Sequence, residues 1–94
     1  MPPLALYATR LEGRAAAAEG DSRRAVERLT AAMRGFEELE AVWEAALSRL
    51  DVAEVLVTTG EGDAGHDLAE EAAAVFTRLG SARELGRAEA LLGR

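Results

Sequence analysis

The chain has no cysteine, lysine, isoleucine, asparagine or glutamine, and aromatic residues make up only 4% of its 94 positions. Without cysteine it can form neither disulfide bonds nor thiolate metal sites, and it has no cysteine nucleophile. No apolar run of about 18 residues and no basic-then-apolar leader occurs, so we expect a cytoplasmic protein without a membrane span. The scarcity of bulky side chains predicts a core made of helices that approach closely through small residues.

The residues that dominate instead are alanine, leucine, glutamate and arginine, all of which favour helices. Valine and threonine, the only β-branched residues, are too scattered to outline strands. The formal net charge is −6, which argues against nonspecific binding to nucleic acid. We therefore expect an all-α protein with no nucleic-acid or membrane partner.

Apolar spacing and turn residues predict five helices. Their expected ranges are about 4–19, 22–39, 41–58, 64–79 and 82–92. Gly20 marks the first turn, and Asp21 and Ser22 offer oxygens for the N-cap that follows it. Gly80 fits a C-cap, and residues 81–84 have the Ser-x-x-Glu spacing of a capping box, which predicts the start of the last helix.

Each expected helix carries an apolar face at helical spacing. The third face is the widest, because Val52, Val55 and Leu56 extend it, and this predicts burial of that helix on more than one side. The five faces consist of Leu4, Tyr7, Leu11, Ala15 and Ala18 in the first helix, Val26, Leu29, Met33, Phe36 and Leu39 in the second, Val42, Trp43, Ala46, Leu47, Leu50, Ala53 and Val57 in the third, Leu68, Ala72, Val75, Phe76 and Leu79 in the fourth, and Leu85, Ala88, Leu91 and Leu92 in the last.

The strongest pattern is an internal repeat of about forty residues with two helices in each unit, which is typical of an α-solenoid. We expect a single domain over 1–94 in which antiparallel helix pairs stack, with unit one at about 4–40, unit two at 41–80 and a terminal helix at 81–94. The residues that recur in register are Gly13 with Ala53 and Gly93, Gly20 with Gly60, Ala25 with Gly65, Ala32 with Ala72, Phe36 with Phe76, and Leu39 with Leu79.

These recurrences resemble the tetratricopeptide-repeat superfamily, in particular the long-helix variety of bacterial transcriptional regulators, signalling ATPases and cyclases. That variety carries a Gly-Asp, Ala, Phe-x-x-Leu-Gly rhythm, and the matching residues here are Gly20, Asp21, Ala25, Ala32, Phe36 and Leu39, and then Gly60, Ala72, Phe76, Leu79 and Gly80. The chain departs from the family at Glu12, where leucine is preferred, at Gly65, where alanine is usual, and in lacking the closing proline. The resemblance implies a non-catalytic scaffold of a bacterial regulatory or signalling protein that binds a peptide, helix or subunit in its groove.

In tetratricopeptide-like arrays the first helix of each unit lines the concave groove. Carried over to this sequence, the groove positions are Tyr7, Arg10 and Arg14 in unit one and Leu47, Leu50, Glu54 and Thr58 in unit two. The arginine pair is suited to hold a carboxylate, and the leucines would form an apolar floor, although Leu50 fits a core position equally well. Trp43 either packs the seam between the units or, if exposed, is a candidate hot spot for a partner.

The number of repeats predicts an association. Two units and a helix are fewer than the three repeats usually needed to cover the core, so we expect a homo-oligomer such as a dimer, or a module of a larger chain. The alternative function is a structural bundle that serves only homo-oligomerisation, in which Phe36, Phe76 and Trp43 meet at a two-fold interface.

Two motifs that imitate functional sites have simpler explanations. Residues 60–65 spell Gly-x-Gly-x-x-Gly after the strand-like segment 55–59, but a dinucleotide site also needs a second parallel strand, which the sequence does not offer. Asp63, His66, Asp67 and Glu70 share a helix face, where the helix dipole favours the acidic residues without any metal.

The remaining polar residues do not assemble a recognisable catalytic set. The acidic cluster of Glu37, Glu38, Glu40 and Glu44 lies beside a turn, where carboxylates are solvated. A single histidine and no cysteine leave few groups for catalysis. We therefore expect no enzyme activity, no cofactor and no metal.

Overall fold

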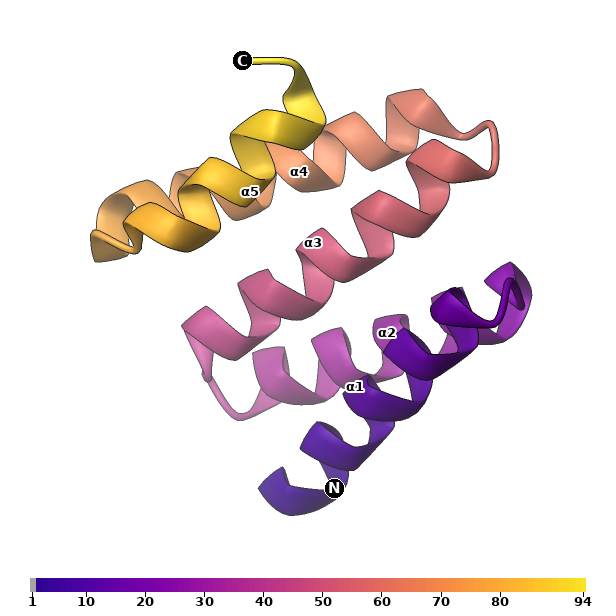
Figure 1. Cartoon of the computed structure of the whole chain (residues 1–94). Coiled ribbons are helices and arrows are strands. Elements are labelled where there is room, and N and C mark those ends of the chain that lie inside the picture. The colour runs from indigo at the N-terminus through magenta and orange to yellow at the C-terminus, as the bar shows by residue number, and fades with distance from the viewer. Residues whose placement is uncertain (1) are drawn as a thin grey trace.

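The computed structural model describes residues 2–94, and five α-helices make up almost all of them (Figure 1). The helices are α1 (Pro3–Ala18), α2 (Ser22–Glu38), α3 (Val42–Thr58), α4 (Gly62–Leu79) and α5 (Ala82–Leu92). Every expected helix is present with its ends within two residues of the predicted ones. No strand occurs in residues 2–94, and the strand-like segment 55–59 lies in α3 and the turn after it. The all-α prediction is confirmed.

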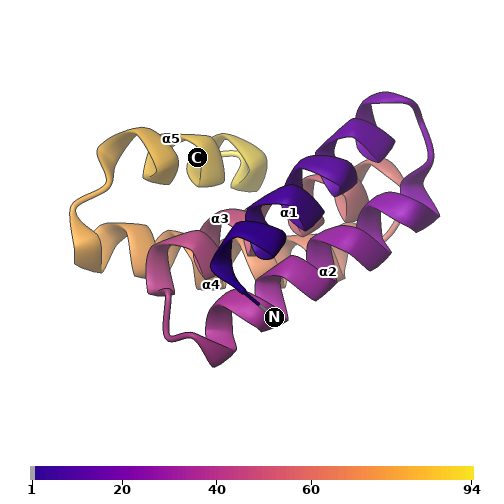
Figure 2. The ribbon, with the colours of Figure 1, turned by 90° about the horizontal axis from the view of Figure 1, so that it is seen from below.

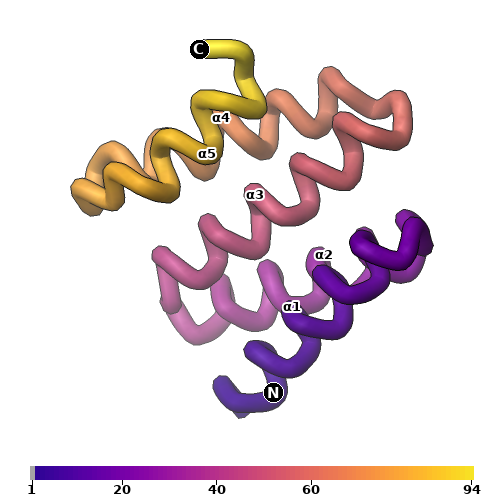
Figure 3. The backbone as a smooth tube through the Cα atoms, in the orientation of Figure 1, coloured from indigo at the N-terminus to yellow at the C-terminus, as the bar shows by residue number. Residues whose placement is uncertain are grey.

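The helices stack as antiparallel pairs in two layers. Figure 1 shows α1, α3 and α5 on one side and α2 and α4 behind them. Figure 3 shows that successive helices alternate in direction while the chain advances along the stack, so that the two termini lie at opposite ends of the stack. Each helix packs mainly against its neighbours in sequence, and α3 also contacts α1 and α5. In the described part of the chain α1 and α5 do not contact each other, because α3 lies between them. Figure 2 shows the layers from below, with α1 and α5 along the upper side and α2 and α4 along the lower side.

The turns recur every twenty residues, each with one residue in the left-handed backbone region. These residues are Gly20 (φ 83°), Glu40 (φ 57°), Gly60 (φ 87°) and Gly80 (φ 70°), so glutamate occupies one position that otherwise takes glycine. The predicted N-cap of α2 is confirmed, because the Asp21 carboxylate accepts a hydrogen bond from the Arg24 backbone N–H at 3.2 Å.

The capping box predicted at residues 81–84 is wrong. The Ser81 side chain makes no capping hydrogen bond to the start of α5. The first turn is held by the backbone instead, through a hydrogen bond of 2.9 Å from the Leu85 N–H to the Ser81 carbonyl.

Burial repeats with the same forty-residue period. Phe36 and Phe76 are 1% and 0% exposed and lie in separate core clusters, one among α1, α2 and α3 and one among α3, α4 and α5. The expectation that these rings meet at a two-fold interface is therefore wrong, because each is buried inside its own chain. Leu39 and Leu79, expected to face inward, are 46% and 48% exposed, because they stand at the very ends of α2 and α4.

The apolar face expected for α1 is the exposed one. Leu4 and Leu11 are 81% and 64% exposed, whereas the residues that α1 buries are Leu6, Thr9, Gly13 and Ala16. The side that carries Gly13 packs inward because the missing side chain lets α1 approach α2 closely. A Cβ atom on Gly13 would lie 2.6 Å from Leu29 Cγ in α2. Close contact through Gly13 therefore favours burial of this face, which has Leu6 as its one large apolar side chain, and leaves Leu4 and Leu11 outside.

Gly65 is the glycine whose added Cβ atom would come nearest to the backbone of another helix, and its replacement tests this packing. A Cβ atom there would lie 2.9 Å from the Ala53 carbonyl oxygen and 2.8 Å from Val57 Cγ2 of α3. We expect Gly65→Ala to lower the free energy of unfolding by about 1–3 kcal/mol, measured by urea denaturation. Gly86→Ala is the matched control, because a Cβ atom meets nothing within 4 Å at that helical position. It should raise stability by about 0.5–1 kcal/mol, and equal effects at both sites would contradict the packing argument.

Replacing Glu40 tests the cost of its left-handed backbone conformation in the turn between α2 and α3. A residue with a Cβ atom is disfavoured by about 1 kcal/mol or more at such a φ, so Glu40→Gly should stabilise the fold by about that amount in thermal or chemical denaturation. Arg34→Gly, at an exposed position within α2, should instead destabilise it by about 0.5–1 kcal/mol. A loss of stability in Glu40→Gly would show that the side chain contributes more than its backbone strain costs.

Candidate functional site

The odd-numbered helices enclose a groove of about 300 Å³ on one side of the stack. Trp43 and Leu47 of α3 lie between side chains supplied by α1 and α5. Four of the eleven basic residues of the chain meet here, although the net charge of the whole chain is −6. We call this the arginine groove, and its lining residues are Arg10, Arg14, Trp43, Leu47, Arg83, Glu84 and Arg87.

The buried carboxylate of Asp51 joins the three helices beneath the groove. Asp51 is 3% exposed, and its Oδ2 accepts a hydrogen bond from Arg10 Nε of α1 at 2.6 Å. Its Oδ1 accepts one from Arg87 Nη2 of α5, also at 2.6 Å. Arg87 additionally donates to both oxygens of Glu54, at 2.9 and 2.5 Å. A negative charge in the interior is thereby matched by two guanidinium groups, as a buried charge requires.

The same contacts raise the pKa of the Arg87 guanidinium. The largest cause is its hydrogen bonding to Glu54, and Asp51 adds a smaller contribution in the same direction, while partial burial acts against both. Arg10 and Arg87 are therefore committed to carboxylates of their own chain and keep a fixed orientation at the edge of the groove.

Arg14 and Arg83 differ from this pair. Both side chains belong to exposed residues on opposite walls of the groove, and neither takes part in the ion pairs found within residues 2–94. The groove therefore combines two arginines held by internal carboxylates with two that are open to an incoming anion.

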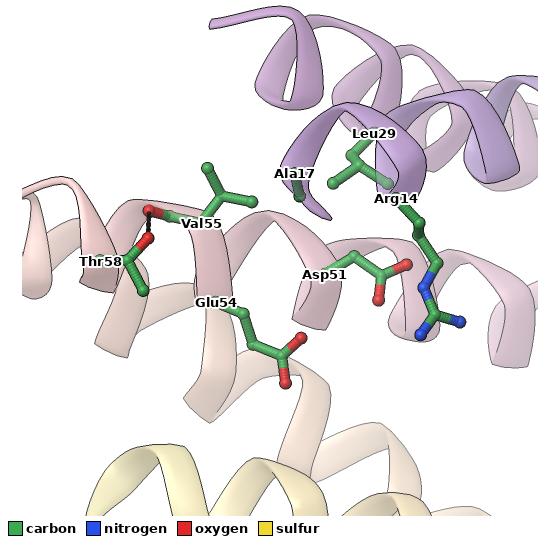
Figure 4. A pocket seen from close by; sticks show the side chains of 7 residues that line it. All are labelled: Arg14, Ala17, Leu29, Asp51, Glu54, Val55 and Thr58. Carbon is green, nitrogen blue, oxygen red and sulfur yellow. Dashed lines mark hydrogen bonds between the residues drawn. The ribbon is translucent and has the colours of Figure 1, made fainter. Parts of the chain in front are cut away.

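A second hollow, of about 280 Å³, adjoins the groove at Arg14. Figure 4 shows Arg14 reaching from α1 toward the side of α3 that carries Asp51 and Glu54, with Val55 and Thr58 farther along that helix. The Thr58 hydroxyl donates to the Val55 carbonyl at 2.8 Å, so this side chain is turned back onto its own helix. Its carboxylates make this hollow more acidic than the arginine groove.

The structure distributes the groove positions expected from the sequence among different places. Arg10, Arg14 and Leu47 line the arginine groove, and Glu54 and Thr58 line the adjoining hollow.

Two of the expected positions lie outside both hollows. Leu50 is 0% exposed and belongs to the core cluster of α3, α4 and α5. Of the two positions that the sequence allowed for it, groove floor or core, Leu50 therefore occupies the core. Tyr7 donates a hydrogen bond of 2.8 Å from its hydroxyl to Glu44 Oε2, and its ring packs edge-on against Phe36 with centroids 5.2 Å apart. The hydrogen bond to Glu44 raises the pKa of the Tyr7 phenol.

Trp43 is 39% exposed and faces the groove. Of the two roles considered for it, seam packing or an exposed position, the geometry gives the exposed one. A half-open indole beside arginines offers a flat apolar surface with a polar N–H, a combination that is common where proteins bind other proteins.

Sequence reasoning missed the contribution of α5. Adding forty residues to Trp43 and Leu47 gives Arg83 and Arg87, so the repeat itself carried the signal. The prediction named residues 81–94 only as a terminal helix and assigned no groove position to it, although the same register makes it the third wall of the groove. Asp51 was missed for another reason, because nothing local in the sequence marks a carboxylate as buried.

The motifs set aside from the sequence form no site. Gly60 is the left-handed turn residue and Gly62 begins α4, so the Gly-x-Gly-x-x-Gly run is a helix-to-helix connection. Residues 2–94 contain no group of three or more histidine, aspartate or glutamate side chains arranged to hold a metal ion. In that same range no helix combines the length and apolarity needed to cross a bilayer.

Comparison with known proteins yields no relative: no family model, curated protein or solved structure matches the chain. The resemblance to tetratricopeptide repeats therefore rests on the sequence pattern alone, and the role of the groove has to be argued from its own geometry.

Replacing Asp51 tests the ionic link beneath the groove. Asp51→Asn keeps the size of the side chain but leaves Arg10 and Arg87 without their buried charge partner. We expect a loss of about 2–4 kcal/mol in the free energy of unfolding, somewhat below the value for a fully buried pair because both guanidinium groups are partly exposed. Glu12→Gln is the control, because the contacts of Glu12 with Arg24 and Arg28 are long (3.8 and 3.9 Å) and exposed. Its effect should stay below about 0.5 kcal/mol, and an equally small effect at Asp51 would refute a structural role for the link.

Proposed function

We propose that the chain is a non-catalytic protein-interaction module whose arginine groove receives an acidic segment of a partner protein. The single observation that carries this proposal is the meeting of four guanidinium groups, an exposed tryptophan and a leucine in one groove of an otherwise acidic chain. The resemblance to tetratricopeptide repeats supports the same role and extends it to a bacterial regulatory or signalling protein.

The difference between paired and unpaired arginines in the groove supports an anionic ligand. Arg14 and Arg83 line the groove from α1 and α5 and have no ion-pair partner in residues 2–94, so a carboxylate bound there would gain charge-assisted hydrogen bonds from them. Arg10 and Arg87 balance the charges of Asp51 and Glu54 and are already oriented by them, so their remaining N–H donors need no ordering on binding. A ligand therefore meets a groove whose shape is largely formed in advance.

The floor of the groove sets the second requirement for the ligand. Trp43 and Leu47 present apolar surface between the two charged walls. A suitable segment carries a leucine or aromatic side chain next to one or more carboxylates, so that the apolar group covers the indole while the acids reach the arginines. Tryptophan and arginine are the residue types most often found at the energetic centre of interfaces.

The internal pairing also supports a binding role over a catalytic one. Both oxygens of Asp51, the most buried carboxylate of the site, are occupied by guanidinium groups. General acid–base catalysis needs a carboxyl group that can exchange a proton with a substrate, and this one is enclosed by its own arginines.

Trp43 is the only tryptophan, so its fluorescence reports directly on the groove. Short peptides with two or three glutamates beside a leucine or phenylalanine should shift its emission on binding, and the same peptides with glutamine in place of glutamate should not. Arg83→Glu should weaken binding by about 10- to 100-fold, the range for one lost charge-assisted contact. Arg78→Glu makes the same change of charge at an exposed position of α4 outside the groove and should bind as the wild type does.

Three results would count against the proposed function. One is a peptide affinity that does not depend on the glutamates. Another is an equal loss in the Arg83→Glu and Arg78→Glu variants, because that would report only the net charge of the chain. The third is binding that is insensitive to salt, since exposed arginines attract carboxylates less strongly as ionic strength rises.

A further inference from the structure

The outward face of α1 is an apolar stripe that no other helix of residues 2–94 covers. Its members are all exposed, and Leu4 and Leu11 are the two most exposed large hydrophobic residues of positions 2–94, at 81% and 64%. We call it the α1 stripe, and it consists of Leu4, Ala8, Leu11, Ala15 and Ala18.

The α1 stripe is unlike the outer faces of the neighbouring helices. The exposed residues of α2 include Arg23, Arg24, Glu27, Arg28 and Arg34, and those of α4 include Asp63, His66, Asp67, Glu70 and Glu71. These faces are solvated in the ordinary way, whereas α1 turns leucine and alanine outward along its whole length. An apolar stripe of this kind marks a surface that packs against another molecule.

The spacing within the stripe fits a second helix. Its residues follow one another at intervals of four, three, four and three, which is the heptad spacing of a two-helix seam. In two parallel copies equivalent positions meet, so Leu4 and Leu11 each pack against their counterparts, and the alanines between and after them let the two helices approach closely. The stripe lies opposite the buried side of α1, which leaves room for a helix to approach.

The charges beside the stripe identify the partner helix as a second copy of α1. Arg14 flanks one edge of the stripe, and Glu12 and Glu19 flank the other. Two parallel copies place the arginine edge of each helix against the glutamate edge of the other, with Arg14 five residues before Glu19 of the second copy, the spacing of an interhelical ion pair. An antiparallel arrangement would set the glutamate edges against each other. Arg14 and Glu19 are both exposed, and neither appears in the ion pairs of residues 2–94.

We propose that the α1 stripe binds the α1 stripe of a second copy of this chain, with the two helices parallel and Arg14 paired with Glu19 on both sides. The 16 residues of α1 span about 24 Å, so the contact is small and the dimer should dissociate on dilution. This pairing uses neither Trp43 nor Arg83 and shares only Arg14 with the arginine groove, so a change at Arg83 separates the dimer from the proposed role of the groove.

Sedimentation or light scattering of the full chain across a concentration series tests the association. The wild type should pass from monomer to dimer, and Leu11→Gln should remain a monomer. The fold of this variant should be unaffected, because Leu11 is exposed, and circular dichroism would verify it. Leu79→Gln alters a comparably accessible leucine away from the stripe and should behave as the wild type does. A wild-type monomer at about 1 mM, the weak limit of specific association, would overturn the proposal, as would a dimer that survives Leu11→Gln.

Charge reversal tests the partner and its direction. Arg14→Glu and Glu19→Arg should each weaken the dimer about threefold or more, and the double variant with both changes should recover it. Failure of the double variant to recover would contradict the ion pair.

Cysteine cross-linking then distinguishes parallel from antiparallel helices, because the natural chain has no cysteine. Ala15→Cys should cross-link with itself under mild oxidation. Stronger cross-linking between the Ala8→Cys and Ala18→Cys variants than of Ala15→Cys with itself would show an antiparallel pair and overturn the proposed arrangement. Arg83→Glu should leave the dimer intact whether or not it abolishes peptide binding.

Discussion

The geometry of the groove depends on one buried carboxylate. Asp51 occupies the middle of α3, and its two oxygens hold one arginine from each flanking helix, so α1 and α5 are fixed relative to a common centre although they do not contact each other in residues 2–94. Hydrophobic burial alone would let these outer helices slide, because alanine-rich surfaces fit together in several registers. Two short ionic hydrogen bonds with defined directions remove that freedom, and the spacing of the groove walls follows from them.

The opposite side of α3 carries the reverse arrangement. Arg49 donates a hydrogen bond of 2.6 Å to Glu37 of α2, and its Nε lies 3.3 Å from Glu71 of α4 without hydrogen-bond alignment. On one face of α3, Asp51 binds two arginines, and on the other face Arg49 lies between two glutamates. The hydrogen bonds of Asp51 to α1 and α5 and of Arg49 to α2 connect α3 to both layers. They explain why α3, which has the most buried residues, also contains charged ones.

The parts of this fold that the sequence predicts are those decided within a few residues. Positive φ at Gly20, Gly60 and Gly80 ends helices locally, and the forty-residue register follows from it. The face that a helix buries is decided by how closely its neighbour can approach, so counting large apolar residues chose the wrong side of α1, where Gly13 makes the contact. The link between Asp51 and an arginine 36 residues later exists only once three helices have been assembled, and no local pattern announces it.

The position of Arg14 joins the two surfaces of α1. It lines the arginine groove and also borders the α1 stripe, so a carboxylate in the groove and Glu19 of a second copy would compete for the same guanidinium. Thermodynamic linkage then requires that ligand binding weaken the dimer by the same factor by which dimerisation weakens ligand binding. A short helical stack can in this way connect its state of association to occupancy of its groove without any movement of the backbone, since the shared component is a single exposed side chain.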